Sequence, residues 1–348
     1  MRIDLLVPEL APHDATGTHT LLLRDLLVEQ GATVRFVTQV PTQVDEAFVL
    51  AADWRDPAPT VILQHGIGSF VADAVIKRRL PVIVNYHNIT PIEFVEPWTP
   101  DVIAGLRWGR SQLDQLAPLA IRGIGDSAYN AAEMRSVGFD DVRVAPVLWR
   151  FEPTATDWTT PSRNGSAERI MLFVGRVAAN KCHEDLLASF AIVHEQHPDT
   201  RLVLVGSPAS ADYQASLDAY ATRLGIADRV DFTGPVSDTE LRAHYAAADV
   251  FVCLSEHEGF CVPIVEAMAA GVPVIAHAAA AVPETVADAG IVLADKRPVT
   301  IASAVGRLLD DSELRHAVRE AGRRRAADFA LSESRPRMLA ALKDLVPA

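Results

Sequence analysis

The chain has 348 residues, 49% of them hydrophobic, and this length favours two domains over a single core. Its formal net charge of −13 disfavours a broad surface for nucleic acid or anionic membranes, because both require dense positive charge. No run of about 18 uncharged apolar residues occurs, so we expect no transmembrane segment. A weak peripheral contact with a membrane remains compatible with this charge.

Two features favour a cytoplasmic protein. The three cysteines, Cys182, Cys253 and Cys261, form an odd and sparse set that predicts no disulfide framework and fits a reducing compartment. The first residues, Met1 to Val7, already read as a strand with Asp4 inside it, which argues against a signal peptide.

Residues 1–160 alternate short apolar strands with amphipathic helices, which predicts crossover connections and a parallel sheet. The expected strands are Ile3–Val7, Thr33–Thr38, Val61–Gln64, Val82–Tyr86 and Gly123–Gly125. The expected helices are Thr20–Gln30, Phe70–Arg79, Asp101–Leu119 and Ala128–Val137. Between Phe151 and Ala167 the periodicity lapses among Pro, Gly, Ser and Thr, so this stretch is predicted to link two domains.

Residues 161–330 repeat the alternation and predict a second doubly wound unit with at least five strands. The expected strands are Arg169–Val174, Arg201–Val205, Val230–Phe232, Val250–Leu254 and Val274–Ala276. The expected helices are Asp185–Glu195, Tyr213–Leu224, Glu240–Ala248 and Phe260–Ala270. Ligands of such sheets lie at the carboxyl ends of the strands, so the loops that follow these strands are the candidate site.

Neither half carries the glycine fingerprint of a dinucleotide-binding domain. Pro8-Glu9-Leu10-Ala11 follows the first strand of the chain, and Gly175-Arg176-Val177-Ala178 follows the first strand of the second half. A nicotinamide dehydrogenase would have Gly-x-Gly-x-x-Gly there, and a Walker loop is also absent.

The first candidate cluster is Gly175-Arg176-x4-Lys181, between a strand and a helix. Two cations five residues apart in one loop can converge on a diphosphate and neutralise the charge that builds on a leaving group. An ordinary charged surface loop is the alternative interpretation.

The second cluster runs from Ser255 to Ala267 and also leads from a strand into a helix. The amides at the start of that helix favour an anion. Glu258 and Glu266 are eight residues apart, roughly 12 Å if both were helical, which suits two ends of one extended ligand better than a shared proton. An acid that merely complements the helix dipole is the alternative for Glu258.

These motifs resemble the retaining GT-B glycosyltransferases of family GT4. Glu258 and Glu266 have the spacing of its Glu-x7-Glu motif, within Ser-x-x-Glu-Gly-Phe-x-x-Pro-x-x-Glu-Ala. Gly-Arg-x4-Lys is matched from Gly175, and Val-x-Phe-x-Gly-x-Val is matched from Val230 to Val236. One departure is Ala280-Ala281 before Val282-Pro283-Glu284, where related enzymes often have Gly-Gly.

The resemblance implies an α/β GT-B fold, in which two Rossmann-like doubly wound domains face a central cleft. Residues 1–160 would bind the acceptor, residues 161–330 the nucleotide-sugar donor, and a helix within about 331–348 would return to the first domain. Arg176 and Lys181 would grip the donor diphosphate, beside Gly175. Glu258 would contact the donor sugar.

The resemblance also assigns the rest of the donor site. The amides of Gly259, Phe260, Cys261 and Val262 would line the sugar and phosphate, and Glu266 would bond the ribose. Val236 would lie near the base, and Ser207 in the loop after the second strand of this half.

The first half matches the family less closely. His87, after a buried strand, resembles the histidine that faces the donor sugar, although a structural hydrogen bond is the alternative. Of the family's glycine-rich loop near the acceptor only Gly17 remains, next to Thr18.

The implied activity is retaining transfer of a hexosyl group from a UDP-, GDP- or ADP-sugar to an unknown hydroxyl acceptor, in polysaccharide, glycolipid or glycosylated metabolite synthesis. No Asp-x-Asp motif is present, so we expect neither a metal nor another cofactor. The alternatives are a sugar phosphorylase, a nucleotide-sugar epimerase and a non-catalytic donor-binding subunit.

Overall fold

The computed structural model describes residues 1–11, 15–96, 98–150 and 168–346, and these fold into two α/β units. The first unit comprises Met1–Ile92, Asp101–Arg150 and the C-terminal residues from Phe329. The second comprises Glu93–Pro100 and, among the described residues, 168–328. The expected linker between the domains, and with it the boundary near residue 160, lies outside the described residues.

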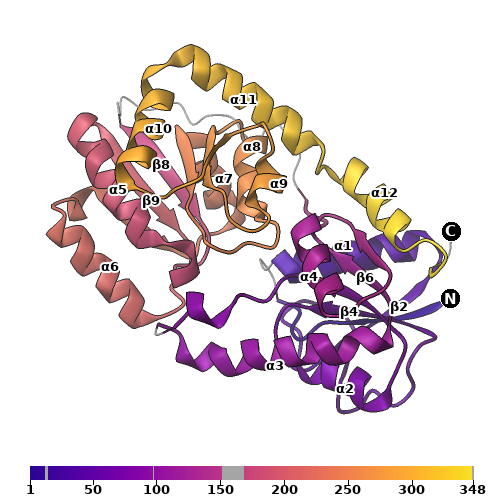
Figure 1. Cartoon of the computed structure of the whole chain (residues 1–348). Helices are drawn as coiled ribbons and strands as arrows, with labels where there is room; N and C mark the ends of the chain where they lie inside the picture. The colour runs from indigo at the N-terminus through magenta and orange to yellow at the C-terminus, as the bar shows by residue number, and fades with distance from the viewer. Residues whose placement is uncertain (12–14, 97, 151–167, 347–348) are drawn as a thin grey trace. The chain divides into compact units, whose positions relative to one another are not determined.

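The first unit is built on a parallel sheet of the order β3-β2-β1-β4-β5-β6-β7. Figure 1 labels β2, β4 and β6 of this sheet. Its strands are β1 Arg2–Leu6, β2 Thr33–Thr38, β3 Phe48–Leu50, β4 Thr60–His65, β5 Val82–Tyr86, β6 Ala120–Gly125 and β7 Val142–Val144. The strand order reverses between β1 and β4, so this is the point where a doubly wound sheet opens a crevice for a ligand. The central strands β4 and β5 are buried along their whole length, as a sheet covered on both faces requires.

Helices follow the strands of the first unit as crossover connections. They are α1 Ala15–Glu29, α2 Phe70–Arg78, α3 Pro100–Leu116 and α4 Ala128–Ser136, with a short 3-10 turn at Ala117–Leu119. The C-terminal helix α12 Leu331–Ala341 also belongs to this unit, and a 3-10 turn at Ile92–Phe94 leads into the segment that belongs to the second unit. Ser69 and Ser127 begin α2 and α4, because each hydroxyl accepts a hydrogen bond from an amide in the first turn. Met338, Ala341 and Leu342 of the C-terminal segment pack into the core of this unit.

The second unit holds a parallel sheet of the order β10-β9-β8-β11-β12-β13. Its strands are β8 Arg169–Val174, β9 Thr200–Val205, β10 Val230–Gly234, β11 Val250–Cys253, β12 Val274–His277 and β13 Ile291–Leu293. Its helices are α5 His183–Gln196, α6 Ala211–Arg223, α7 Asp238–Ala247, α8 Val262–Ala269, α9 Val282–Val286, α10 Pro298–Asp310 and α11 Ser312–Ala327. Helix α10 packs against α5, and α11 packs against α8.

One segment from the first half of the chain belongs to the second unit, which differs from the expected assignment of all of residues 1–160 to one domain. Within Glu93–Pro100, Phe94 stacks on His257 with ring centroids 5.9 Å apart, and Trp98 lies 5.2 Å from the ring of Tyr213. Trp98 also packs on the hydrophobic core of this unit. Aromatic burial therefore fixes this segment to the second unit.

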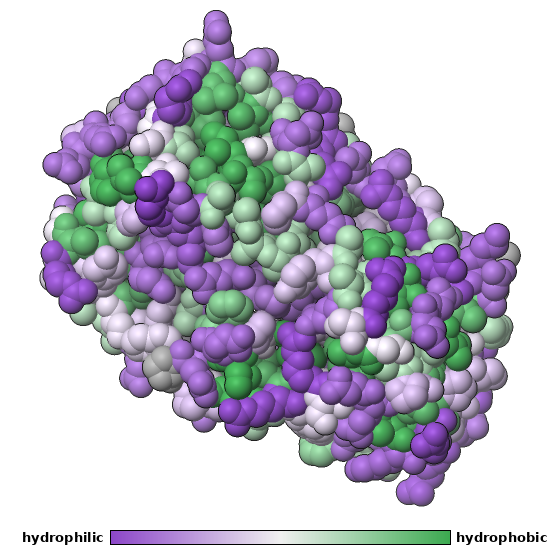
Figure 2. All heavy atoms as spheres, in the orientation of Figure 1, coloured by the Kyte–Doolittle hydropathy of each residue, from purple (hydrophilic) through white to green (hydrophobic). Residues whose placement is uncertain are grey.

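The helices of the described residues include none that combines the length and the apolar character needed to cross a membrane. On the face shown in Figure 2, hydrophilic residues are spread over both units, with apolar residues between them.

Candidate active site

Backbone hydrogen bonds join the loops that leave the carboxyl edge of the second sheet. The amide of Val177, after β8, donates to the carbonyl of Ser207, after β9, at 2.9 Å. The amide of Gly206 donates to the carbonyl of Gly234, at the end of β10, at 3.1 Å. The three loops are thus held together, and they carry the predicted residues Gly175, Arg176, Ser207 and Val236. Of these, Arg176 and Ser207 are exposed and Val236 is half-buried.

Gly206 allows two of these loops to approach each other closely. Its φ of +145° lies in a region that side-chain-bearing residues rarely adopt, and a Cβ built there would lie 2.1 Å from the carbonyl oxygen of Gly175. The sequence placed Ser207 at the site but gave no reason for the glycine before it.

Lys181 and Glu258 meet, although 77 residues separate them in the sequence. The ammonium of Lys181, at the end of the 3-10 turn Ala179–Lys181, donates to Glu258 Oε1 at 2.6 Å. The two side chains are 20% and 11% exposed. Burial opposes the charge of Lys181, but the neighbouring negative groups, Glu258 first, outweigh it and raise the pKa of the ammonium.

Helix α8 begins at this ion pair. Cys261 precedes its first residue, Val262, and has a left-handed backbone with φ of 71°, which turns the chain from the loop of Gly259 into the helix. The backbone carbonyl of Phe260 accepts from the hydroxyl of Thr285 at 2.6 Å, which anchors the loop to α9. These contacts fix the start of α8, where the sequence predicts an anion-binding helix end.

Glu266, in the second turn of the same helix, is 8% exposed and accepts a hydrogen bond from the hydroxyl of Tyr245 at 2.8 Å. Burial and the charge of Glu266 raise the pKa of Tyr245, so the phenol stays protonated and donates. Tyr245, which was not singled out from the sequence, is thus a partner for this acid within an apolar helix.

Two thiols lie against the ion pair. Cys253 Sγ and Cys261 Sγ are 4.0 Å apart, and together with a Glu258 carboxylate oxygen their sulfur atoms fall within 4.8 Å of one another. Such a set could ligate a soft cation. However, the ammonium of Lys181 already supplies a positive charge to that carboxylate.

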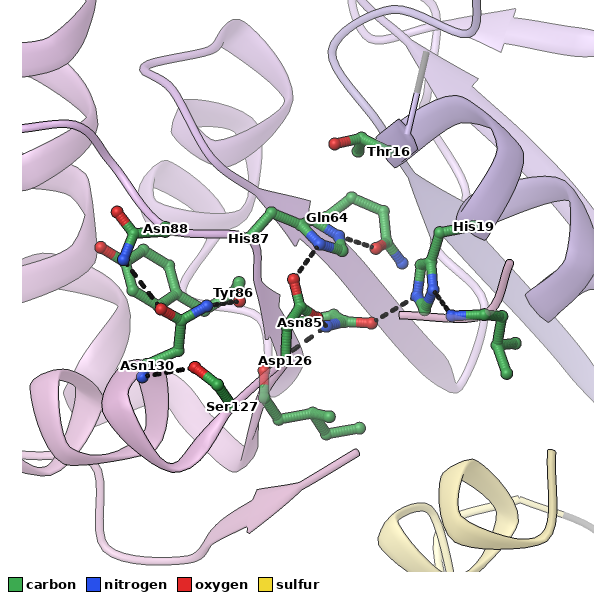
Figure 3. A network of polar contacts seen from close by, with 12 residues as sticks. Thr16, His19, Gln64, Asn85, Tyr86, His87, Asn88, Asp126, Ser127 and Asn130 are labelled. Atoms are coloured by element: carbon green, nitrogen blue, oxygen red, sulfur yellow. Dashed lines mark hydrogen bonds and ion pairs between the residues drawn. The ribbon is translucent and has the colours of Figure 1, made fainter. Parts of the chain in front are cut away.

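His87 lies in the first unit, at the end of β5, with its side chain 7% exposed (Figure 3). Its Nδ1 is 2.8 Å from Asp126 Oδ2, after β6, and its Nε2 is 2.6 Å from Gln64 Oε1, near the end of β4. Neither Gln64 nor Asp126 was singled out from the sequence. Both stand at carboxyl ends of parallel strands, and that position is the signal by which they could have been found.

Gly17 and Thr18 lie in the first turns of α1, which begins at Ala15 and not at Thr20 as expected. A Cβ on Gly17 would lie 2.5 Å from the carbonyl oxygen of Ala11, so the glycine lets the helix pack against the chain that leads into it. The residue that remains of the expected glycine-rich loop is therefore helical.

Solved structures share the architecture of this chain. The structure of sucrose-phosphate synthase from Thermosynechococcus elongatus has a TM-score of 0.77 at 21% identity, covering 99% of this chain and 98% of that chain. Anabaena HepE in complex with UDP and glucose has a TM-score of 0.78 at 18% identity, covering 99% of this chain and all of that one. At these identities the likeness shows the fold alone, and that fold is GT-B, as predicted.

Comparison of the sequence with known families and proteins gives further matches. Residues 156–325 match the family model described as Glycosyl transferases group 1. A mannosylfructose-phosphate synthase of Agrobacterium fabrum is 35% identical over 143 residues, which cover 40% of this chain and 30% of that protein. A D-inositol 3-phosphate glycosyltransferase of Catenulispora acidiphila is 34% identical over 212 residues, which cover 57% of this chain and 50% of that protein.

The match of residues 156–325 to the group 1 glycosyltransferase model confirms the resemblance drawn from the motifs of this half. The matches span half or less of the length of these two curated relatives.

Proposed function

We propose that this protein is a retaining GT4-type glycosyltransferase that moves a hexosyl group from a nucleotide diphosphate sugar to a hydroxyl acceptor without a metal ion. The observation that carries the proposal is the Lys181–Glu258 pair, with its 2.6 Å contact at the carboxyl edge of a doubly wound sheet. A cation and a carboxylate side by side suit the diphosphate and the sugar of one donor.

The proposed roles follow the positions of the residues. The exposed guanidinium of Arg176 and the ammonium of Lys181 bind the diphosphate and stabilise the charge it gains as the glycosidic bond breaks. Glu258 accepts hydrogen bonds from the sugar, and the amides at the start of α8 face the phosphate. Glu266, already bonded to Tyr245, accepts from the ribose hydroxyls.

The function is tested by a thermal-shift screen with UDP-, GDP- and ADP-sugars, followed by product analysis with the sugar that binds. UDP is the first nucleotide to try, since it is the ligand of the Anabaena HepE structure. Inositol 3-phosphate, named in the relatives, is the first acceptor. At 100 times its dissociation constant, a ligand should stabilise the protein by about 2.7 kcal/mol.

Turnover is expected to survive EDTA, because the two cations neutralise the diphosphate, and the product should retain the anomeric configuration of the donor. If EDTA abolished turnover and manganese or magnesium restored it, the metal-free assignment would be refuted. An NMR coupling constant of the product that shows an inverted anomeric configuration would refute retention. A requirement for inorganic phosphate would instead identify a sugar phosphorylase, and an epimerised donor would identify a nucleotide-sugar epimerase. Donor binding without turnover would identify a non-catalytic donor-binding subunit.

Arg176→Ala and Glu266→Ala should affect different kinetic constants. Arg176 meets charge that grows in the transition state, so its loss should lower kcat about 100-fold with little change in donor KM. The ribose does not change during the reaction, so the loss of Glu266 should mainly raise donor KM. Steady-state kinetics with varied donor measure both, and the reverse pattern would mean that the donor lies the other way round.

A further inference from the structure

Two thiols and a carboxylate come together beside the start of α8, inside the second unit. Cys253 Sγ and Cys261 Sγ are 4.0 Å apart, and a carboxylate oxygen of Glu258 lies within 4.8 Å of both. Among the residues that the structure describes, this is the one group of three or more His, Cys, Asp or Glu side chains whose ligand atoms lie so close together. Two sulfur atoms and an oxygen are a donor set for a thiophilic cation.

The distance between the two sulfur atoms suits a metal ion better than a disulfide bond. On a tetrahedral zinc ion with Zn–S bonds of about 2.3 Å, two thiolates lie about 3.8 Å apart. The 4.0 Å between Cys253 Sγ and Cys261 Sγ is close to this value. A disulfide bond requires roughly 2.05 Å, so the two sulfur atoms would have to approach each other by about 2 Å.

The backbone on both sides of the group resists such an approach. Cys253 is the last residue of β11, which pairs with β8 and β12 in the interior of the sheet. Cys261 comes directly before α8, and the hydroxyl of Thr285 fastens its loop by donating to the carbonyl of Phe260 at 2.6 Å. The fold therefore places the sulfur atoms at a separation that a metal ion can bridge.

The charge of the group also suits a divalent ion. With both thiols protonated, the carboxylate of Glu258 and the ammonium of Lys181, 2.6 Å apart, leave no net charge. A divalent cation that binds both sulfur atoms as thiolates releases two protons to water, and the sum is again zero. This balance matters because Cys253 is 1% and Cys261 9% exposed, and uncompensated buried charge is costly. Magnesium and calcium prefer oxygen ligands, so the thiols select zinc and its thiophilic analogues.

The group reaches solvent at its ion pair. The side chains of Lys181 and Glu258 are 20% and 11% exposed, so an ion can enter past the carboxylate and go on to the sulfur atoms. On this path it meets the ammonium of Lys181, and two cations beside one carboxylate repel each other. Binding of an ion therefore competes with the contact between Lys181 and Glu258.

We propose that Cys253, Cys261 and Glu258 form a zinc site whose occupation inhibits the protein. The inhibition rests on the proposed function, in which Glu258 accepts hydrogen bonds from the donor sugar. A carboxylate that binds the ion is withdrawn from the sugar, and the ion also opposes the charge of Lys181. The transfer reaction itself still requires no metal.

The site is tested without any turnover by titrating the reduced protein, freed of reductant, with Cd²⁺. The thiolate-to-cadmium absorption in the ultraviolet should saturate at one ion per chain, and excess Zn²⁺ should diminish it. Cys253→Ser should weaken binding more than about 100-fold, because it removes a ligand, and the loss of an outer contact alone costs about 10–100-fold. Absence of the band in the unsubstituted protein, or equal binding by Cys253→Ser, would overturn the site.

Cys182→Ser is the matched control. Cys182 is also a buried thiol, 3% exposed, but its sulfur lies 3.2 Å from Lys296 Nζ and is not part of the group. Its replacement should leave the affinity for Cd²⁺ unchanged. A loss of binding as large as that of Cys253→Ser would mean that the ion is held elsewhere, and the site would be wrong.

Lys181→Met should act in the opposite direction. It removes the cation that competes for Glu258, so Cd²⁺ should bind about tenfold more tightly. Glu258→Gln, which removes a ligand of the ion, should instead weaken binding. The titrations use protein that circular dichroism shows to be folded. Weaker binding by Lys181→Met than by the unsubstituted protein would contradict the competition.

The inhibition is tested with the donor that binds in the screen. At ten times its dissociation constant, Zn²⁺ should lower the turnover of the unsubstituted protein about tenfold, and EDTA should restore it. Cys253→Ser should keep its turnover at the same concentration of Zn²⁺. Equal inhibition of both proteins would overturn the inhibitory role. If no donor is turned over at all, the proposed function fails, whereas the Cd²⁺ titration still decides the site.

Discussion

Lys181→Met is expected to lower turnover about 100-fold and the free energy of unfolding by about 3 kcal/mol. The loss of turnover reflects one preorganised cation removed from the proposed diphosphate site. The loss of stability has a separate cause: Glu258, only 11% exposed, keeps its charge and loses the partner that lies 2.6 Å away. Breaking a buried ion pair on one side leaves the other charge uncompensated, which costs more than the pair itself contributes.

The cause of the stability loss can be tested by a second substitution. Lys181→Met combined with Glu258→Gln removes the stranded charge, so the double variant should regain most of the stability, measured by urea unfolding, and none of the turnover. Recovery of both would show that Lys181 acts on turnover only through folding.

Lys296→Met provides a lysine of similar burial outside the proposed donor site. Lys296 is 17% exposed and pairs with Glu256 at 2.6 Å and Asp185 at 2.9 Å. Its replacement should destabilise the second unit by less, because Asp185 and Glu256 are 29% and 38% exposed and water can solvate them. Turnover per folded molecule should stay within about twofold of that of the unsubstituted protein. A loss as deep as that of Lys181→Met would mean that any broken ion pair in this unit abolishes activity.

Gly206→Ala is expected to lower the free energy of unfolding by more than about 4 kcal/mol, a loss typical of severe backbone strain. The new Cβ would lie 2.1 Å from the carbonyl oxygen of Gly175 and 2.7 Å from its carbonyl carbon, and these backbone atoms cannot rotate away. The two loops would have to separate, and the loop that carries Arg176 would move with them. Urea unfolding followed by circular dichroism measures the loss.

Gly225→Ala isolates the strain of the backbone from the clash. Gly225 has φ of +72°, and a Cβ built there meets no atom within 4 Å. This variant should therefore cost only about 1–2 kcal/mol, the penalty of a left-handed conformation. Equal losses in the two variants would mean that the contact between Gly206 and Gly175 contributes nothing.

Much of the strand and helix pattern follows from local signals. Thr33–Thr38, Val82–Tyr86 and Arg169–Val174 have the bounds expected from their apolar runs. The predicted helix starts were less accurate. Helix α5 begins two residues before its expected start, after left-handed Cys182, and α8 begins two residues after its expected start, following left-handed Cys261. A left-handed cysteine carries no sequence signal, because its conformation is imposed by the packing around it.

The strands that the sequence did not predict share one property. Phe48–Leu50, Val142–Val144 and Ile291–Leu293 are three residues long and stand at the edges of their sheets. Three residues are too few to show an alternating pattern, and such a strand owes its conformation to the neighbour it pairs with.

The sequence by itself determined the class of this protein: alternating strands and helices in both halves, and the spacing of Gly175, Arg176 and Lys181 and of Glu258 and Glu266. These are local features, since each motif lies in one loop or at one helix start. Only the tertiary structure decided that Lys181 bonds Glu258, or that His87 lies between Gln64 and Asp126. The reason is geometric, because parallel strands bring residues 23 to 77 positions apart to one edge of a sheet, and no local pattern records which of them will meet.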